Sequence, residues 1–326
     1  MQSPPNLDDG TKFAACSIKQ AFVRQVILGL RALESSLPPW CLLALVWPVA
    51  ALLTTWELVL LGPTVRDFDR LPPSLRPAGS RLGWIWRLWC QRINFRLTKL
   101  LILWPDRLET DRWRPRFRST GFEQLERLVA EGRPVVLTLM HFGPHALLRY
   151  WLRARGVAVG ALVGKQLALR PVYRDYLDGL SDGASGLGNT PHLFDLGQLR
   201  QAVRFLQSQG LLMVALDAAQ GRDVWVEGDD YALRLRTGAI RLATAANAIL
   251  VPCFAFSHRA FGMTLHLGLP VSAEGNTQEI CANLMHQFIP VLRAHPEHCE
   301  GQLLKSFRAS SQDLEPVYAG ASQTSP

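Results

Sequence analysis

The chain has 326 residues, enough for one large domain or two small ones, and its 48% hydrophobic residues can bury a core. Its six cysteines are scattered, without a Cys-x-x-Cys pair or a Cys/His cluster at zinc spacing, which argues against a disulfide framework. We expect a reducing compartment, no metal and no cofactor. A net charge of +8 with ten tryptophans favours an anionic membrane surface or nucleic acid as partner, with a merely basic enzyme as the alternative.

Residues 1–37 are predicted to form a polar, partly helical lead-in to an apolar segment. Residues 40–56 are apolar and uncharged, and residues 58–61 continue this segment after Glu57. A membrane-spanning helix needs about 20 such residues, and Pro48 would kink one. Cations flank the segment on both sides, so the positive-inside rule places both flanks in the cytoplasm. We therefore expect a re-entrant or shallow hairpin anchor, and a single span and a buried core helix are the alternatives.

A second segment, residues 84–104, mixes Trp, Leu and Ile with four cations, after a loop rich in Pro, Gly and Arg at 62–83. On a helix the cations would fall largely on one side, which is typical of a helix that lies in a membrane interface: Arg87, Arg92, Arg96 and Lys99. A helix packed on its own domain is the alternative. We find no nucleic-acid-binding module in this region, and the neighbouring apolar segment favours a membrane, so we expect no nucleic-acid partner.

From residue 84 to about 308, strand-like and helix-like segments alternate. This pattern predicts an α/β fold with a mixed, mainly parallel sheet flanked by helices, preceded by the N-terminal apolar, membrane-associated helical segment. The expected strands are 135–140, 157–163, 211–216, 249–256 and 263–267. The expected helices are 121–131, 144–155, 171–180, 196–209, 238–247 and 277–295. The chain would thus divide into residues 1–83, an α/β domain at 84–308, and a tail of disorder-like composition at 309–326.

Two predicted strands end in residues that can do acid–base chemistry. His141 follows the first strand, and Pro144 suits the first position of the next helix, whose free N–H groups would lie near His141 and could hold an oxyanion or a phosphate. Asp217 follows the third strand. Because the ends of parallel strands meet at one edge of a sheet, we expect His141 and Asp217 to share that edge, although each alone could be structural.

Cations supply a third feature of this edge. Arg234, Arg236 and Arg241 bracket a predicted helix start at which Thr237 suits the N-cap, an arrangement that binds anions. Lys165 and Arg170 follow the second strand and could hold an acceptor phosphate, with a solvated loop as the alternative. We therefore expect these five cations to bind substrate.

The chain resembles the lipid A biosynthesis lauroyl/myristoyl acyltransferases, within the broader lysophospholipid acyltransferase-like group. The resemblance covers about residues 84–308. It rests on the following blocks of sequence: 141–143 after a strand, the loop at Asp217, 237–243, 248–252, 296–298 and 307–308. An N-terminal membrane segment is also typical of the family.

The resemblance implies transfer of an acyl chain to a hydroxyl of a membrane lipid. It implies acyl carrier protein as donor, a lipid or glycolipid acceptor, and a place on the cytoplasmic face of the bacterial inner membrane. In the family motif a histidine deprotonates the acceptor, and an acidic residue five positions later supports the histidine. Arg-rich surface would steer the acidic carrier protein.

This chain departs from the family motif, because Ala146 stands where the acidic residue is expected and His145 precedes it. Three interpretations follow. Asp217 could replace the missing carboxylate. His141 could act unsupported, or paired with His145, on an easily activated acceptor such as an amine. The protein could also be an inactive relative that binds acyl carriers or lipids. We predict a catalytic group of His141, Asp217 and His145, with either a carrier-protein or a CoA thioester as donor.

Overall fold

A computed structural model gives the fold of the chain. It describes residues 32–33, 36–60, 68–77, 80–102, 114–145, 147–155, 157–164, 192–208, 210–258 and 262–310. The predicted helix 171–180 and the tail from 311 onward lie outside these residues.

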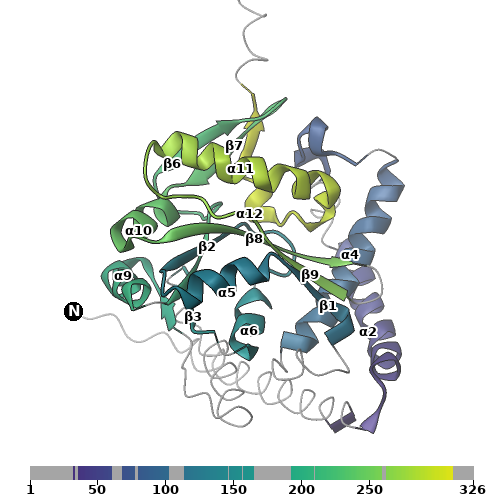
Figure 1. Ribbon diagram of the computed structural model, residues 1–326. Coiled ribbons are helices and arrows are strands. Elements are labelled where there is room, and N and C mark those ends of the chain that lie inside the picture. The colour runs from purple at the N-terminus through teal and green to yellow at the C-terminus, as the bar shows by residue number, and fades with distance from the viewer. Residues whose placement is uncertain are drawn as a thin grey trace, which may run out of the picture.

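The centre of the fold is a seven-stranded sheet of order β1-β9-β8-β2-β5-β3-β4 (Figure 1). All neighbouring pairs in it are parallel except β8 with β9, which run antiparallel. The mainly parallel mixed sheet expected from the sequence is therefore confirmed. Its strands are β1 (Phe117–Thr120), β2 (Val135–Leu139), β3 (Val159–Leu162), β4 (His192–Phe194), β5 (Leu211–Ala215), β8 (Ile249–His258) and β9 (Gly262–Leu267).

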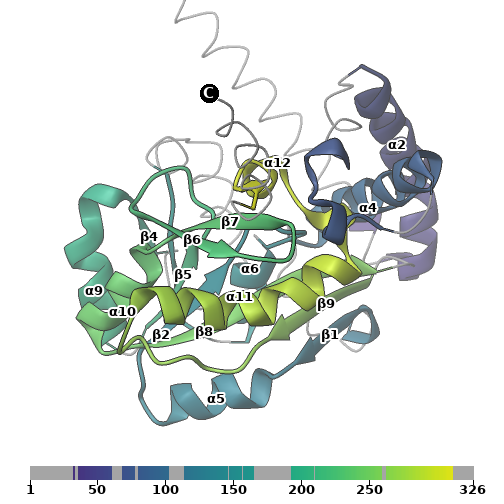
Figure 2. The same cartoon turned by 90° about the horizontal axis from the view of Figure 1, so that it is seen from above.

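Helices cover both faces of this sheet (Figures 1 and 2). The side chains of β2 alternate between two cores, because successive residues of a strand point to opposite faces. Val136 faces α9 (Leu199–Gln207), α10 (Gly238–Ala246) and α11 (Thr277–Ala294). Leu137 faces the other core, which contains residues of α5 (Phe122–Ala130) and α6 (Leu147–Ala154). The strand is buried throughout, which explains why its sequence is apolar except at Thr138.

A small antiparallel sheet of order β10-β7-β6 lies beside α11 and was not predicted. Its strands are β6 (Asp223–Glu227), β7 (Tyr231–Arg236) and β10 (Phe307–Ala309). The N–H of Arg236, at the end of β7, donates to the carbonyl of Leu216 at 2.6 Å. The small sheet therefore joins the large one next to the end of β5.

The helix expected from Pro144 begins later than predicted. Residues 143–145 form a turn, and α6 begins at Leu147. The free N–H groups of a helix start are therefore not placed directly after His141, and that part of the prediction is wrong. The sequence Gly-Pro-His turns the chain before the helix can form.

The N-terminal apolar segment forms one continuous helix, α2 (Pro39–Leu60), with Pro48 inside it, rather than a hairpin. It lies beside α4 (Arg81–Ile102) at one end of the molecule (Figures 1 and 2). The ring centroids of Trp47 on α2 and Trp89 on α4 are 5.8 Å apart. Within the described ranges, no helix has the length and apolar character needed to cross a membrane.

The two helices differ in how they use their apolar residues. On α4, Trp84, Leu88 and Ile93 are buried, so this helix packs on its own domain. Among the α2 side chains that the structure describes, only Ala50, Ala51 and Thr54 are buried. Many large apolar side chains of this helix are exposed: Trp40, Leu45, Trp47, Val49, Leu52, Leu53, Trp56 and Val59. A buried core helix is therefore wrong for α2.

Candidate active site

His141 and Asp217 lie at the same level of the sheet, on neighbouring parallel strands. Leu139 at the end of β2 pairs with Ala215 at the end of β5, and each polar residue follows two positions later. The carbonyl of Leu139 also accepts from the N–H of Leu216 at 2.8 Å, so the pairing continues past the strand ends. The sequence expectation of a shared edge thus corresponds to a direct contact.

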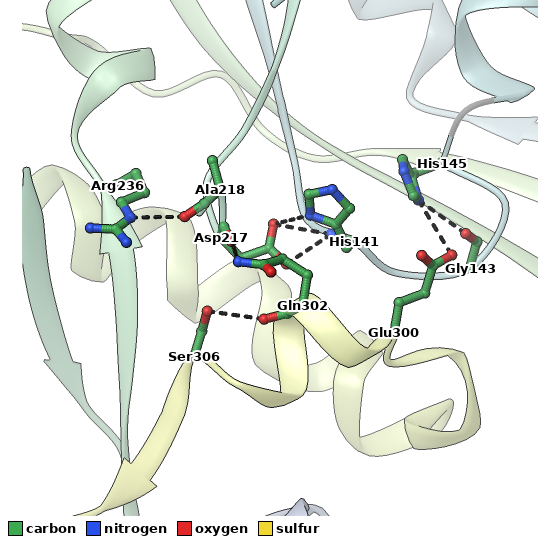
Figure 3. Close-up of polar contacts among 9 residues, drawn as sticks. All are labelled: His141, Gly143, His145, Asp217, Ala218, Arg236, Glu300, Gln302 and Ser306. Carbon is green, nitrogen blue, oxygen red and sulfur yellow. Dashed lines mark hydrogen bonds and ion pairs between the residues drawn. The ribbon is translucent and has the colours of Figure 1, made fainter. Parts of the chain in front are cut away.

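The carboxylate of Asp217 is hydrogen-bonded to both the backbone N–H and the ring of His141 (Figure 3). Its Oδ1 lies 2.9 Å from Nδ1 of His141, and both carboxylate oxygens accept from the His141 N–H, at 3.1 and 3.0 Å. The Asp217 side chain is fully buried, while 32% of the His141 side chain is exposed. The carboxylate holds the proton of the neutral ring on Nδ1, which leaves the lone pair of Nε2 for a substrate.

Opposing effects set the pKa of His141. Burial lowers the pKa. The hydrogen bond and negative charge of Asp217, together with the charge of Glu300, raise it by more than burial lowers it. The net result is a pKa above the ordinary 6.5. A raised pKa makes the ring a stronger base than an ordinary histidine.

His145 lies against His141, with the ring centroids 5.1 Å apart and the rings nearly perpendicular. Its Nδ1 faces the carbonyl of Gly143 at 3.2 Å and the carboxylate of Glu300 at 3.8 Å (Figure 3). Burial lowers the pKa of His145, and the attraction of Glu300 only partly offsets this. The neighbouring imidazoles therefore have pKa values shifted in opposite directions, a pattern that separates acid and base roles in enzymes.

Residues 298–302 hold both loops of the site, which the sequence did not reveal. Phe142 pairs with Cys299 in an isolated antiparallel bridge. The Glu300 N–H donates to the His141 carbonyl at 2.9 Å, and the Gln302 side-chain amide donates to the Asp217 carbonyl at 3.0 Å. A single segment thus fixes His141 and Asp217 relative to each other.

Gly143 is the tightest point of this arrangement. Its N–H donates to the carbonyl of His298 at 2.8 Å, and its φ is +54°. A Cβ at this position would lie 2.2 Å from the carbonyl oxygen of Ala255. The turn after His141 therefore requires glycine both for its backbone conformation and for its close contact with β8.

His298 supports the turn as a neutral residue. The N–H of Ser257 donates to its Nε2 at 3.1 Å, and the side chain is 3% exposed. Burial lowers the pKa of His298 to about 3. His295 and Glu297 lie close enough to suggest a metal site with it. However, the bond from Ser257 leaves the ring proton on Nδ1, the atom that faces Glu297, so no lone pair is directed at an ion there.

Arg236 was expected to bind substrate, but its side chain binds backbone carbonyls of the protein itself. Its Nε, Nη1 and Nη2 each donate at 2.8 Å, to the carbonyls of Ala218, Gly221 and Ala219. The guanidinium also pairs with Asp223, and the side chain is only 10% exposed. It shapes the loop that follows Asp217, which corrects the sequence prediction.

Of the other predicted cations, neither Arg234 nor Arg241 forms a hydrogen bond or ion pair with the two histidines within the described ranges. Arg234 lies half-buried on β7, and its Nε has no hydrogen-bond partner in the described part of the chain. Arg241 is exposed on α10. Thr237 stands at the N-cap of α10, yet its hydroxyl faces the carbonyl of Arg222 at 3.4 Å instead of capping the helix. Lys165 and Arg170, like Ala146, lie outside the described residues.

No protein-family model matches the chain, and a search of curated proteins finds no match.

Proposed function

We propose that this protein is a membrane-associated acyltransferase similar to the lipid A lauroyl/myristoyl transferases, with His141 as general base. It transfers a fatty acyl or related polyketide-type acyl chain from an acyl carrier protein or CoA thioester. The acceptor is a hydroxyl or amine of a lipid or glycolipid at the cytoplasmic face of the inner membrane.

The observation that carries this proposal is the hydrogen bond between His141 and Asp217. The family motif places its carboxylate five residues after the histidine, where this chain has Ala146. Asp217 supplies an equivalent partner from the neighbouring strand, at 2.9 Å from Nδ1. This contact supports the proposal that Asp217 takes the role of the missing carboxylate.

The chemistry follows from this geometry. Nε2 of His141 removes a proton from the acceptor, whose oxygen or nitrogen attacks the thioester carbonyl. Asp217 stabilises the imidazolium that forms, and the imidazolium then protonates the departing thiolate. The result is a new ester or amide and a free thiol.

The side chains around His141 favour direct transfer of the acyl chain from donor to acceptor, without an acyl-enzyme intermediate. Within the described residues, no serine, threonine or cysteine is hydrogen-bonded to its ring. The nearby thiol of Cys299 is buried, and burial, with the charges of Glu297 and Asp217, raises its pKa far above the usual range. A thiol held in this way is a poor nucleophile, so we propose no covalent intermediate on the enzyme.

Membrane association is supported by the exposed apolar side of α2. Tryptophans at an interface place an apolar ring in lipid and a polar N–H near water. Trp40 and Trp56 are 67% and 65% exposed, and Trp86 on the adjacent α4 is 62% exposed. We propose that α2 lies against the bilayer surface.

Release of thiol from an acyl-CoA, measured with lipid vesicles as acceptor, tests the enzymatic proposal. Replacing His141 by alanine should lower the rate by roughly 10²-fold or more. His286, exposed on α11, provides the control, because His286→Ala should leave the rate unchanged. Equal rates for His141→Ala and the intact chain would remove His141 as the base. Tight carrier-protein binding without any turnover would favour the inactive lipid- or carrier-binding alternative.

A further inference from the structure

Glu300 gives the candidate site a second carboxylate that acyl transfer to a hydroxyl does not use. Its side chain is 31% exposed and lies 3.8 Å from Nδ1 of His145. Its charge acts on the rings of both His141 and His145. The side chain is therefore placed beside both imidazoles and keeps part of its carboxylate open to solvent.

The charge around the two imidazoles is negative. Within the described residues, the carboxylates of Asp217 and Glu300 act on both rings, and besides them only His141 acts, on His145. Arg236, which could have balanced them, has its donors bound to loop carbonyls and Asp223. Such a site attracts a cation and disfavours an acceptor that brings a phosphate close to the reacting group.

Two adjacent imidazoles match the proton requirements of an ammonium acceptor. An alkylammonium has a pKa near that of lysine, about 10.4, so it must lose one proton before its nitrogen can attack. It must lose a second proton after the C–N bond forms. A hydroxyl acceptor needs only one base, which would leave the pair of His145 and Glu300 without a role.

We propose that the acceptor carries a primary ammonium group, which Glu300 binds and the two imidazoles deprotonate in turn. This inference rests on the proposed acyl transfer and names its acceptor class. His145 takes the first proton and passes it to solvent, and the free amine attacks the thioester carbonyl. His141 takes the second proton from nitrogen and gives it to the sulfur as the C–S bond breaks. Ammonium and thioester thus yield amide, thiol and one released proton.

The opposite pKa shifts are consistent with this order. The lowered pKa of His145 keeps its ring neutral and favours quick release of an accepted proton to solvent, whereas Asp217 stabilises the protonated form of His141 during the second step. Asp217 is fully buried behind His141, so Glu300 is the carboxylate that can reach a bound cation.

A competition between matched acceptors tests the inference. The full chain is given decanoyl-CoA with equal amounts of dodecylamine and dodecanol in neutral vesicles, and amide and ester are measured by mass spectrometry. Amide should predominate. Glu300→Gln and His145→Gln should each lower the amide-to-ester ratio by about fivefold or more, the scale of one partly exposed ion pair. Glu274→Gln, at an exposed surface position, should leave the ratio unchanged.

The outcomes separate the two proposals. Ester as the main product, or an unchanged ratio in both Glu300→Gln and His145→Gln, would overturn the ammonium acceptor while the acyltransferase proposal stands. Loss of both products in Glu300→Gln but not in the more conservative Glu300→Asp would also favour an ammonium-binding carboxylate, provided that the recovered product is amide. No thiol release with either acceptor would contradict acyl transfer itself.

Discussion

The guanidinium of Arg236 holds the carbonyl oxygen of Ala218, the residue that directly follows Asp217. Two further carbonyls of the same loop bind the other guanidinium nitrogens. An arginine that the sequence associates with substrate anions is thus part of the support for the loop that follows Asp217. The planar, forked guanidinium places a donor nitrogen at each of three separate carbonyls, whereas a lysine has a single nitrogen for all its donors.

Replacing Arg236 should damage the site through its structure. Arg236→Met should lower the free energy of unfolding by about 2 kcal/mol, because it leaves three loop carbonyls and Asp223 without their partner. Arg236→Lys should keep the charge but lose most of the loop contacts, and should lower kcat. Arg241→Gln, at an exposed position on α10, should change stability by less than about 0.5 kcal/mol. Denaturant unfolding measures all three, and a fully stable Arg236→Met would contradict this role.

Replacing Asp217 by asparagine keeps the size of the side chain but removes its charge, so it tests what the charge contributes to the proposed catalysis. Asp217→Asn should lower kcat by up to about 10⁴-fold, as loss of the orienting carboxylate does in catalytic triads. It should also move the rising limb of the pH–rate profile to lower pH, because the raised pKa of His141 depends on Asp217. In the intact chain the rate should rise with pH through that pKa, since the base must be neutral. Asp229→Asn, which affects only a surface ion pair with Arg293, serves as control.

Two glycines give a matched test of the turn after His141. Gly143→Ala should destabilise the fold strongly, because φ is +54° and the new Cβ would lie 2.2 Å from a carbonyl oxygen. Gly238 is the first residue of α10, and a Cβ added there would have no neighbouring atom within 4 Å. Gly238→Ala should therefore be neutral or stabilising by about 0.5–1 kcal/mol. Thermal melts compare the two, and equal stability of both variants would show that the turn tolerates a side chain.

The free energy of unfolding should fall at acid pH, because His298 is held neutral in the folded protein. Its folded pKa is about 3, whereas the unfolded chain binds the proton near 6.5. The unfolded state therefore binds more protons between these values, so the stability from His298 is present above about pH 6.5 and is lost as pH falls toward 3. Urea unfolding from pH 7 to 4.5 should show this slope, and His298→Asn should reduce it. An unchanged slope in that variant would assign the acid sensitivity to other groups.

Binding to vesicles should depend on the exposed tryptophans of α2. A Trp40→Gln/Trp56→Gln variant should bind anionic vesicles at least several-fold more weakly in co-sedimentation, because interfacial binding scales with buried apolar area. Leu269→Gln changes a residue that is 68% exposed after β9 and should have no effect. If the tryptophan variant bound as well as the intact chain, α2 would not be the membrane contact.

Long apolar segments were the predictable part of the fold. Residues 135–139 and 211–215 are buried almost throughout, so they appear in sequence as apolar runs interrupted only by Thr138. Strand β7 alternates apolar residues with Arg234 and Arg236, a half-buried strand pattern that was interpreted as an anion site. Short strands such as β4, with three residues, carry too few positions for any periodicity.

The site was predictable only where the sheet dictates it. His141 and Asp217 follow adjacent parallel strands in register, so their proximity follows from topology. Glu300 reaches the site through the bridge between Phe142 and Cys299, a tertiary pairing that leaves no local signal. The delayed start of α6 also escaped prediction, because Pro144 is as compatible with a turn as with a helix start.

The hydrogen bonds from residues 300 and 302 to the two loops also bear on the order of assembly. Strands β2 and β5 can pair as soon as both have left the ribosome, but the backbone of His141 and that of Asp217 gain these contacts only after residue 302 has followed. Synthesis is slow compared with local folding, so β2 and β5 can pair before the backbones of His141 and Asp217 are fixed relative to each other. A nascent chain whose strands have already paired would thus lack both of these contacts until this late segment docks.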